Sequence, residues 1–221
     1  KAAGRNIGGG GDPALAVGAG AKATAGGATA IGMVANASNT FATAIGKSAA
    51  ASGDSSIAIG QNTKATQEKA IAIGDASQAT NIGATALGRS SEATGSSATA
   101  LGSLASATGT TATAVGMQAS ASGSESLAIG NTASATSGRA LAVGTNAKAT
   151  GASSVAVGSG AGGSGPRGFA SSINSSGSVV NTNKTINYAT IAEGDNAVAL
   201  GYYANAKNSG VAVGQNALAA T

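Results

Sequence analysis

The chain has 221 residues, of which 36 are glycine and only 2% are aromatic, and it contains neither cysteine nor histidine. This composition lacks the large side chains of a conventional globular core, and without cysteine there is no disulfide framework. The formal net charge of +4 comes from lysines and arginines scattered along the chain, which argues against nucleic-acid binding.

Residues 1–14 (KAAGRNIGGGGDPA) contain a glycine run followed by Asp12-Pro13, so we expect a lead-in segment before the regular part of the chain begins. The glycines at 8–11 match a phosphate-binding loop only weakly, because no helix-forming pattern follows them. Residues 15–221 are predicted to form the main domain.

A glycine then recurs every fourteen residues from Gly18 to Gly158, eleven times in unbroken register. Such a short fixed period indicates a solenoid in which each repeat is one coil. We number each coil 1 to 14 with this glycine last. Position 12 is always alanine, position 13 is always Ile, Val or Leu, and position 11 is threonine or aliphatic. Positions 11 to 13 are therefore predicted to form a strand, with 11 and 13 on one face and 12 on the other.

A second strand is predicted at positions 3 to 5, because position 5 is alanine, position 3 is small and position 4 is mostly polar. Position 6 is Ser or Thr and position 7 is usually Gly or Asn, residues that favour a turn, and the glycine at 14 supplies the other corner. The predicted fold class is thus an all-β parallel roll of 14-residue coils, in which thirteen coils stacked about 4.8 Å apart make a rod roughly 60 Å long.

Charged residues are absent from positions 3, 5 and 11 to 14 of the regular coils. If positions 11 and 13 fill the interior, the alanines at position 12 form a dry outward stripe, which we expect to be an interface between identical chains. The other interpretation is that alanine simply tolerates a solvent-facing strand. The predicted interface residues are Ala16, Ala30, Ala44, Ala58, Ala72, Ala86, Ala100, Ala114, Ala128, Ala142 and Ala156.

The register breaks after Gly158 and returns at VALG, 198–201, and at VAVG, 211–214. The excess residues form a predicted insertion at about 162–190. Within it, SVVN and TINYATI flank residues 182–184 and are predicted to form a β-hairpin. Such an insertion either carries function or locks an interface.

The repeated [T/I/L/V]-A-[I/L/V]-G, with A-x-A-[T/S] between copies, resembles the head domain of the YadA-like trimeric autotransporter adhesins of Gram-negative bacteria. The resemblance implies a left-handed parallel β-roll, three identical chains around a common axis, and a place at the tip of a surface fibre. It also implies binding to extracellular-matrix proteins such as collagen, fibronectin or laminin, and attachment to host cells. SSIAIGQNT (55–63) is a near copy of the N-S-V-A-I-G-x-x-S pattern of collagen-binding heads, but Ser replaces its first Asn and Thr its last Ser.

The chain has no run of 18 apolar residues and no signal peptide at Lys1, so this fragment is not expected to contact a membrane. The resemblance places it at the bacterial cell surface, and we expect an outer-membrane anchor in a C-terminal part beyond these residues. We expect ligand contacts from Lys22, Lys64 and Lys148 at position 4, and from Arg167 and Lys184 in the insertion, acting together through avidity.

Other classes of protein fit less well. Hexapeptide acyltransferases need a period of six and usually a histidine, and calcium rolls need aspartate-rich nonapeptides, so we expect no enzymatic activity, no cofactor and no metal. The main alternative is a passive repeat protein, such as an ice-binding or structural surface-fibre protein. Threonine recurs at position 11, but Ile57 and Ile71 interrupt the array that an ice-binding face requires.

Overall fold

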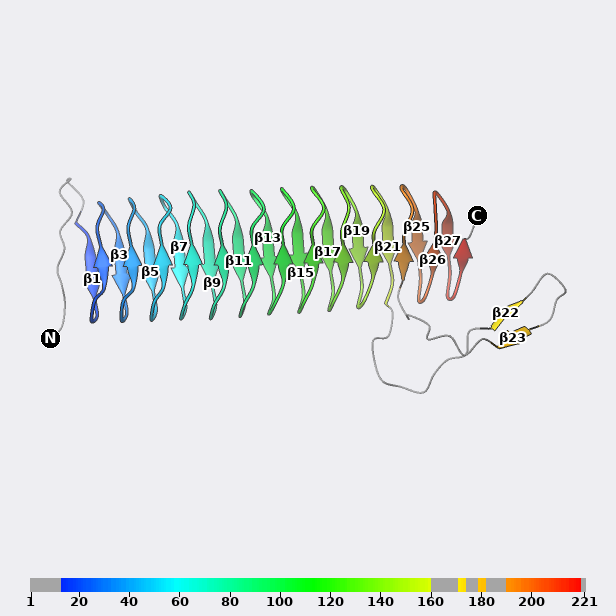
Figure 1. The fold of residues 1–221 in the computed structure, drawn as a ribbon, viewed down its shortest axis with the longest axis horizontal. Helices are drawn as coiled ribbons and strands as arrows, with labels where there is room; N and C mark the ends of the chain where they lie inside the picture. The colour runs from blue at the N-terminus through cyan, green and yellow to red at the C-terminus, as the bar shows by residue number, and fades with distance from the viewer. Residues whose placement is uncertain (1–12, 160–170, 174–178, 182–189, 220–221) are drawn as a thin grey trace.

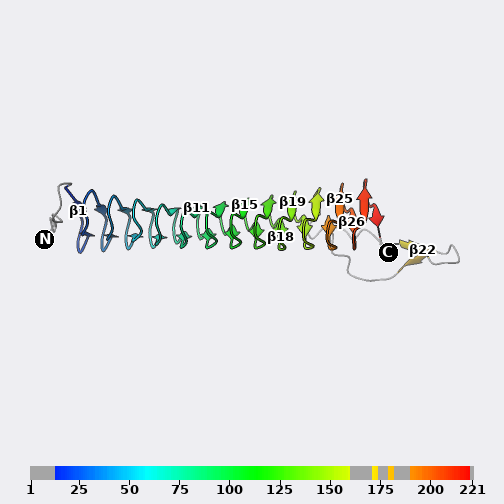
Figure 2. The ribbon, with the colours of Figure 1, turned by 90° about the horizontal axis from the view of Figure 1, so that it is seen from above.

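The computed structural model describes residues 13–159, 171–173, 179–181 and 190–219. Residues 13–159 and 190–219 form a straight rod of stacked coils that contains only strands and turns (Figure 1). Two thirteen-stranded parallel sheets run the length of the rod. Figure 2 shows them as two layers, with β11, β15 and β19 on one side and β18 on the other.

Each coil contributes a strand of three residues to one sheet, sheet A, and a strand of two residues to the other, sheet B. The strands of the insertion belong to neither sheet. Sheet A consists of β1 (Leu15–Val17), β3 (Thr29–Ile31), β5 (Thr43–Ile45), β7 (Ile57–Ile59), β9 (Ile71–Ile73), β11 (Thr85–Leu87), β13 (Thr99–Leu101), β15 (Thr113–Val115), β17 (Leu127–Ile129), β19 (Leu141–Val143), β21 (Val155–Val157), β25 (Val198–Leu200) and β27 (Val211–Val213). Sheet B consists of β2 (Lys22–Ala23), β4 (Asn36–Ala37), β6 (Ala50–Ala51), β8 (Lys64–Ala65), β10 (Gln78–Ala79), β12 (Glu92–Ala93), β14 (Ser106–Ala107), β16 (Ser120–Ala121), β18 (Ser134–Ala135), β20 (Lys148–Ala149), β24 (Ile191–Ala192), β26 (Asn205–Ala206) and β28 (Leu218–Ala219).

Equivalent residues of successive coils pair with one another. In sheet A, Ala86 lies between Ala72 and Ala100, and in sheet B, Ala79 lies between Ala65 and Ala93. The predicted parallel roll with 14-residue coils is confirmed, because every strand pairs with the strand one coil away and none skips a coil along the described rod.

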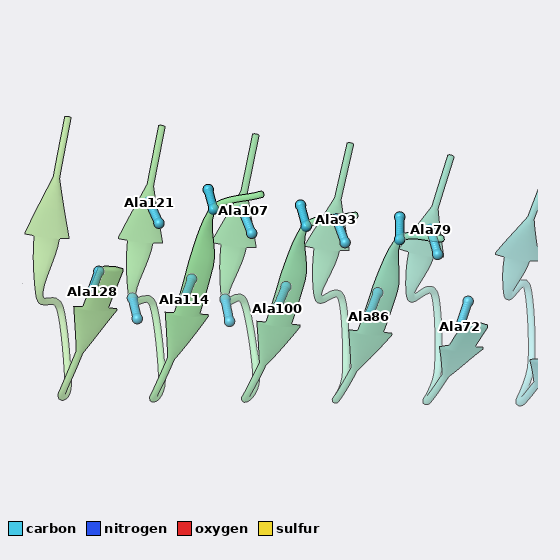
Figure 3. Packing of buried hydrophobic residues seen from close by; sticks show 14 of the residues in the cluster. Ala72, Ala79, Ala86, Ala93, Ala100, Ala107, Ala114, Ala121 and Ala128 are labelled. Carbon is cyan, nitrogen blue, oxygen red and sulfur yellow. The ribbon is translucent and has the colours of Figure 1, made fainter. Parts of the chain in front are cut away.

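The interior of the roll is filled by very small side chains. Positions 3, 5, 10 and 12 point inward, and nearly all of them are fully buried alanines, with serine or threonine replacing alanine in some coils. Figure 3 shows the alanines at position 12, such as Ala100, facing the alanines at position 5, such as Ala93 and Ala107, between the two sheets. The largest fully buried side chains among the described residues are Thr63 and Thr190. The two sheets therefore lie too close together to accommodate leucine or isoleucine.

The prediction that the alanines at position 12 face outward is wrong. Within a single chain, Ala30 and the other members of the column are 0% exposed, apart from Ala16 in the first coil at 3%. They are Ala16, Ala30, Ala44, Ala58, Ala72, Ala86, Ala100, Ala114, Ala128, Ala142 and Ala156. The branched side chains at positions 11 and 13 project outward instead, because the space between the sheets has room only for methyl and hydroxyl groups. The alanine column is therefore the core and cannot serve as the interface between chains.

Both predicted turns are present, at positions 14 to 2 and at positions 7 to 9 of each regular coil. In one coil, the Ala105 N–H donates to the Gly102 carbonyl across the first turn, and the Ala98 N–H donates to the Gly95 carbonyl across the second. Gly102 has a φ of +136°, and a Cβ placed on it would lie 2.5 Å from the Gly116 carbonyl oxygen. Stacking at this turn therefore requires the recurrent glycine, both for its backbone conformation and for its lack of a side chain.

The insertion contains the expected hairpin, but its strands differ from those predicted. β22 (Ser171–Ile173) pairs antiparallel with β23 (Val179–Asn181), so SVVN forms the second strand of the hairpin and not the first. The end of TINYATI cannot pair with SVVN, because Ile191 begins β24 and pairs with Lys148 in sheet B. Thr190 also belongs to the roll, where its hydroxyl donates to the Gly201 carbonyl. Of the predicted lead-in segment, 1–14, residues 1–12 lie outside the described residues.

Candidate assembly and adhesive surfaces

The outer face of sheet A is a continuous aliphatic surface, which we call the aliphatic face. It is formed by the outward side chains at positions 11 and 13. Position 13 contributes Val17, Ile31, Ile45, Ile59, Ile73, Leu87, Leu101, Val115, Ile129, Val143, Val157, Leu200 and Val213. Position 11 contributes Leu15, Thr29, Thr43, Ile57, Ile71, Thr85, Thr99, Thr113, Leu127, Leu141, Val155, Val198 and Val211.

The aliphatic face carries no charged side chain along the described strands of sheet A. Even in the middle of the rod its side chains remain partly open to solvent, with Leu101 42% and Ile129 38% exposed. Monomeric proteins rarely expose contiguous apolar patches larger than a few hundred Å², and this face follows the whole rod. The chemistry of this face suits burial against another apolar protein surface.

The outer face of sheet B is polar in most coils, with Ala50, Ile191 and Leu218 as apolar exceptions, and we call it the polar face. It is formed by the outward residues at positions 4 and 6. In ten successive coils position 6 is Ser or Thr: Thr24, Ser38, Ser52, Thr66, Thr80, Thr94, Thr108, Ser122, Thr136 and Thr150. Some of these hydroxyls bridge neighbouring coils, because Thr24 Oγ1 donates to the Ser38 carbonyl at 3.4 Å and Thr66 Oγ1 donates to the Thr80 carbonyl at 3.3 Å. The hydroxyl row therefore ties adjacent coils together as well as facing solvent.

The structure places three of the predicted ligand contacts on the polar face, where Lys22, Lys64 and Lys148 are all exposed. It does not bring them together. Lys22 and Lys64 are three coils apart, about 14 Å, and Lys64 and Lys148 are six coils apart, about 29 Å. Arg167 and Lys184 lie outside the described residues. The lysines thus form a sparse row and not a single binding pocket.

Ion pairs among the described residues are few and exposed. At one turn, Lys69 Nζ lies 2.9 Å from Glu68 Oε1. This hydrogen bond and the attraction between the two charges lower the pKa of Glu68 and raise the pKa of Lys69. Near the end of the rod, Lys207 Nζ lies 3.8 Å from Glu193 Oε2. Because water screens such pairs, they contribute little to stability and mark a solvated surface.

Membrane-spanning helices and clusters of metal ligands are both absent from the part of the chain that the structure describes. It contains no helix that is long and apolar enough to span a membrane. It also contains no group of three or more His, Cys, Asp or Glu side chains placed to hold a metal ion.

The repeat of this chain matches the family profile described as the YadA head domain repeat (2 copies). Successive matches cover residues 10–35, 37–63, 51–77, 65–91, 79–105, 93–119, 107–133, 121–146, 135–161, 188–204 and 192–217. Together they span nearly all of the rod on both sides of the insertion. A search of curated proteins found no match.

Proposed function

The chain belongs to the YadA head domain family, and from this premise we propose that it is a bacterial surface adhesin head that binds host extracellular-matrix proteins and attaches the cell to host tissue. The head repeats indicate a head of the trimeric autotransporter adhesin type, a class exposed at the surface of the outer membrane. The observation that carries the proposal is the match of these repeats along the rod, and the division of that rod into one aliphatic and one polar face agrees with it.

In this proposal the chain is a homotrimer in which the aliphatic faces of three copies pack around a common axis. The core of a single roll contains only small side chains, so it buries little apolar surface for each residue that it orders. Packing three aliphatic faces together removes the branched side chains at positions 11 and 13 from water and supplies the missing burial. The polar face of each copy remains turned toward solvent and toward the ligand.

The ligand is a long matrix protein such as fibronectin, collagen or laminin, bound through many weak contacts. A sparse row of lysines spread along a rod suits a repetitive ligand better than a compact one. Three copies in one head, and many heads on one cell, raise the avidity without a strong single contact. The proposed contacts are Lys22, Lys64, Lys148, Arg167 and Lys184.

The proposal is tested first by sedimentation, which should give a trimer, and then by solid-phase binding to a panel of fibronectin, collagen and laminin. Replacing the five proposed cations with glutamine should reduce binding to the matrix protein that the head recognises. The matched control replaces the other five cations of residues 13–221, Lys47, Lys69, Arg89, Arg139 and Lys207, which removes the same charge from other places. Equal losses in both variants would contradict the assignment of these contacts, and a stable single chain would contradict the trimer.

A passive or ice-binding role predicts a different result. The threonines at position 11 do face outward, but they share the aliphatic face with isoleucine, leucine and valine, and the proposed trimer buries them. Thermal hysteresis by the purified rod, together with no binding to any matrix protein, would favour this alternative over the adhesin.

A further inference from the structure

The threonines at position 11 fall into blocks along the aliphatic face. Beginning at the first coil, the face carries one leucine, two threonines, two isoleucines, three threonines and then only leucine or valine. The threonine blocks are Thr29 with Thr43, and Thr85 with Thr99 and Thr113. Because the block lengths differ, the pattern does not repeat along the rod.

The hydroxyl groups of these five threonines have no hydrogen-bond partner among the other described residues of the chain. This sets them apart from the inward-facing hydroxyls, such as that of Ser91, which donates to the Gly88 carbonyl at 2.9 Å. In a single chain the five outward hydroxyls are half-buried and can bond to water. When the aliphatic face is covered, they need a polar partner on the covering surface.

We propose that these threonine blocks set the axial register of the three chains, an inference that rests on the trimer proposed above. In a symmetric trimer of parallel chains, each coil lies at the level of the same coil in the other two copies. Threonine layers then meet threonine layers, where the hydroxyls bond to one another or to shared water, and aliphatic layers meet aliphatic layers. A second copy of this chain in the same register therefore offers a polar partner to every threonine layer and an apolar partner to every aliphatic layer.

Any other register leaves hydroxyls against hydrocarbon. A shift of one coil places threonine against an aliphatic residue at each of the four boundaries between blocks, and a shift of two or three coils does so at more levels. Isolated polar residues in coiled-coil interfaces fix register in the same way, at some cost in stability. The core cannot do this, because its small side chains are buried within each single chain.

The test replaces all five threonines with valine, which has the same shape without the hydroxyl. The chain has no cysteine, so two preparations of the full chain can each carry one introduced cysteine, K47C with a nitroxide and T145C with a gadolinium tag. Both sites are exposed turn residues at position 1, seven coils apart, or about 34 Å along the axis. In mixed trimers, pulsed electron spin resonance then reports the distance between tags on different chains.

Trimers with the unmodified aliphatic face should give one narrow distribution of distances between the two tags, for each tag pair that the three-fold symmetry allows. The five-valine variant should remain trimeric and add shorter and longer distances, because each shift of one coil changes the axial separation by about 4.8 Å. Changing the five threonines to serine, which keeps the hydroxyl, should restore the original distribution. The matched control changes five outward threonines of the polar face to valine: Thr80, Thr94, Thr108, Thr136 and Thr150. This control should also leave the distribution unchanged.

A second variant makes the opposite change, I57T with I71T, which merges the two threonine blocks and should also broaden the distances. Trimers whose distances stay unchanged in both the valine and the merged-block variants would overturn the register assignment and leave the proposed trimer intact. Sedimentation of the unmodified protein as a single chain would overturn the trimer itself, and the register assignment with it.

Discussion

The recurrent glycine at position 14 should be hard to replace, and Gly102→Ala in the middle of the rod tests this. Gly102 has a φ of +136°, and an added Cβ would meet the Gly116 carbonyl oxygen at 2.5 Å and the carbonyl carbon at 2.7 Å. The opposing atoms are backbone, so no side-chain rotation can relieve the contact. The matched control is Gly83→Ala, because Gly83 also has a positive φ, of +63°, but its added Cβ would meet nothing closer than the Ser97 hydroxyl at 3.4 Å.

The two substitutions should differ several-fold in their cost to folding. For Gly83→Ala, a left-handed backbone costs about 1–2 kcal/mol, and the lower entropy of the unfolded chain offsets part of this. For Gly102→Ala, the backbone conformation costs about 1–3 kcal/mol. The clash also forces two coils apart where the Gly116 N–H donates to the Leu101 carbonyl at 2.8 Å and the Gln118 N–H donates to the Ser103 carbonyl at 3.0 Å. Weakening these bonds adds about 1 kcal/mol each, so we expect a loss of about 3–5 kcal/mol.

Urea unfolding followed by far-ultraviolet circular dichroism measures both losses, at one protein concentration because the proposed trimer would add to stability. Gly102→Ala should lower the unfolding midpoint much further than Gly83→Ala does. If the two variants unfold within about 1 kcal/mol of each other, the coils are not stacked as tightly at this turn as the distances indicate, and the explanation given for the glycine period is wrong.

Three further predictions concern the core, the aliphatic face and the exposed ion pair. Ala100→Leu should destabilise the protein by about 3 kcal/mol or prevent folding, because the space between the sheets is full, whereas Ala50→Leu on the polar face should cost less than about 1 kcal/mol in the same urea assay. Leu101→Lys should abolish the proposed trimer in sedimentation, whereas Ser106→Lys on the polar face should leave it intact. The lowered pKa of Glu68 favours the folded state above the ordinary glutamate pKa of about 4.3, and this contribution is lost as the pH falls through the lowered pKa. Because the ion pair is fully exposed, acid unfolding of Glu68→Gln should superimpose on that of the parent, and a displaced curve would show that the pair is structural.

The period of the sequence was sufficient to predict the architecture of the rod. A glycine every fourteen residues defines the coil, and the alternation within residues 11 to 13 and 3 to 5 defines two strands with turns between them. The pairing of Ala86 with Ala72 and Ala100 follows directly from that period. The hairpin of the insertion was predicted less well, because residues 171–191 contain several short strand-forming runs and nothing local selects which two of them pair.

The error in the candidate interface came from the choice of strand face, which the period leaves open. Exchanging the two faces of a strand moves every side chain from the core to the surface. Choosing the branched residues for the core follows the usual rule that large apolar side chains are buried. That rule fails here because the rod exposes its large apolar residues and leaves room inside only for small ones.

A relation between the two halves of the coil, visible in the backbone of the structure, explains which face is buried. The turns at positions 7 to 9 and 14 to 2 are equivalent after a shift of seven residues, and both contain a residue with positive φ, such as Lys69 at position 9 and Ser90 at position 2. The same shift relates position 5 to position 12, and position 3 to position 10. Because lysine and glutamate occur at position 4, positions 3 and 5 must point inward, and their equivalents 10 and 12 must then point inward too. The alanines are thus the core, and the branched residues at positions 11 and 13 form the outer face that is available for packing against other chains.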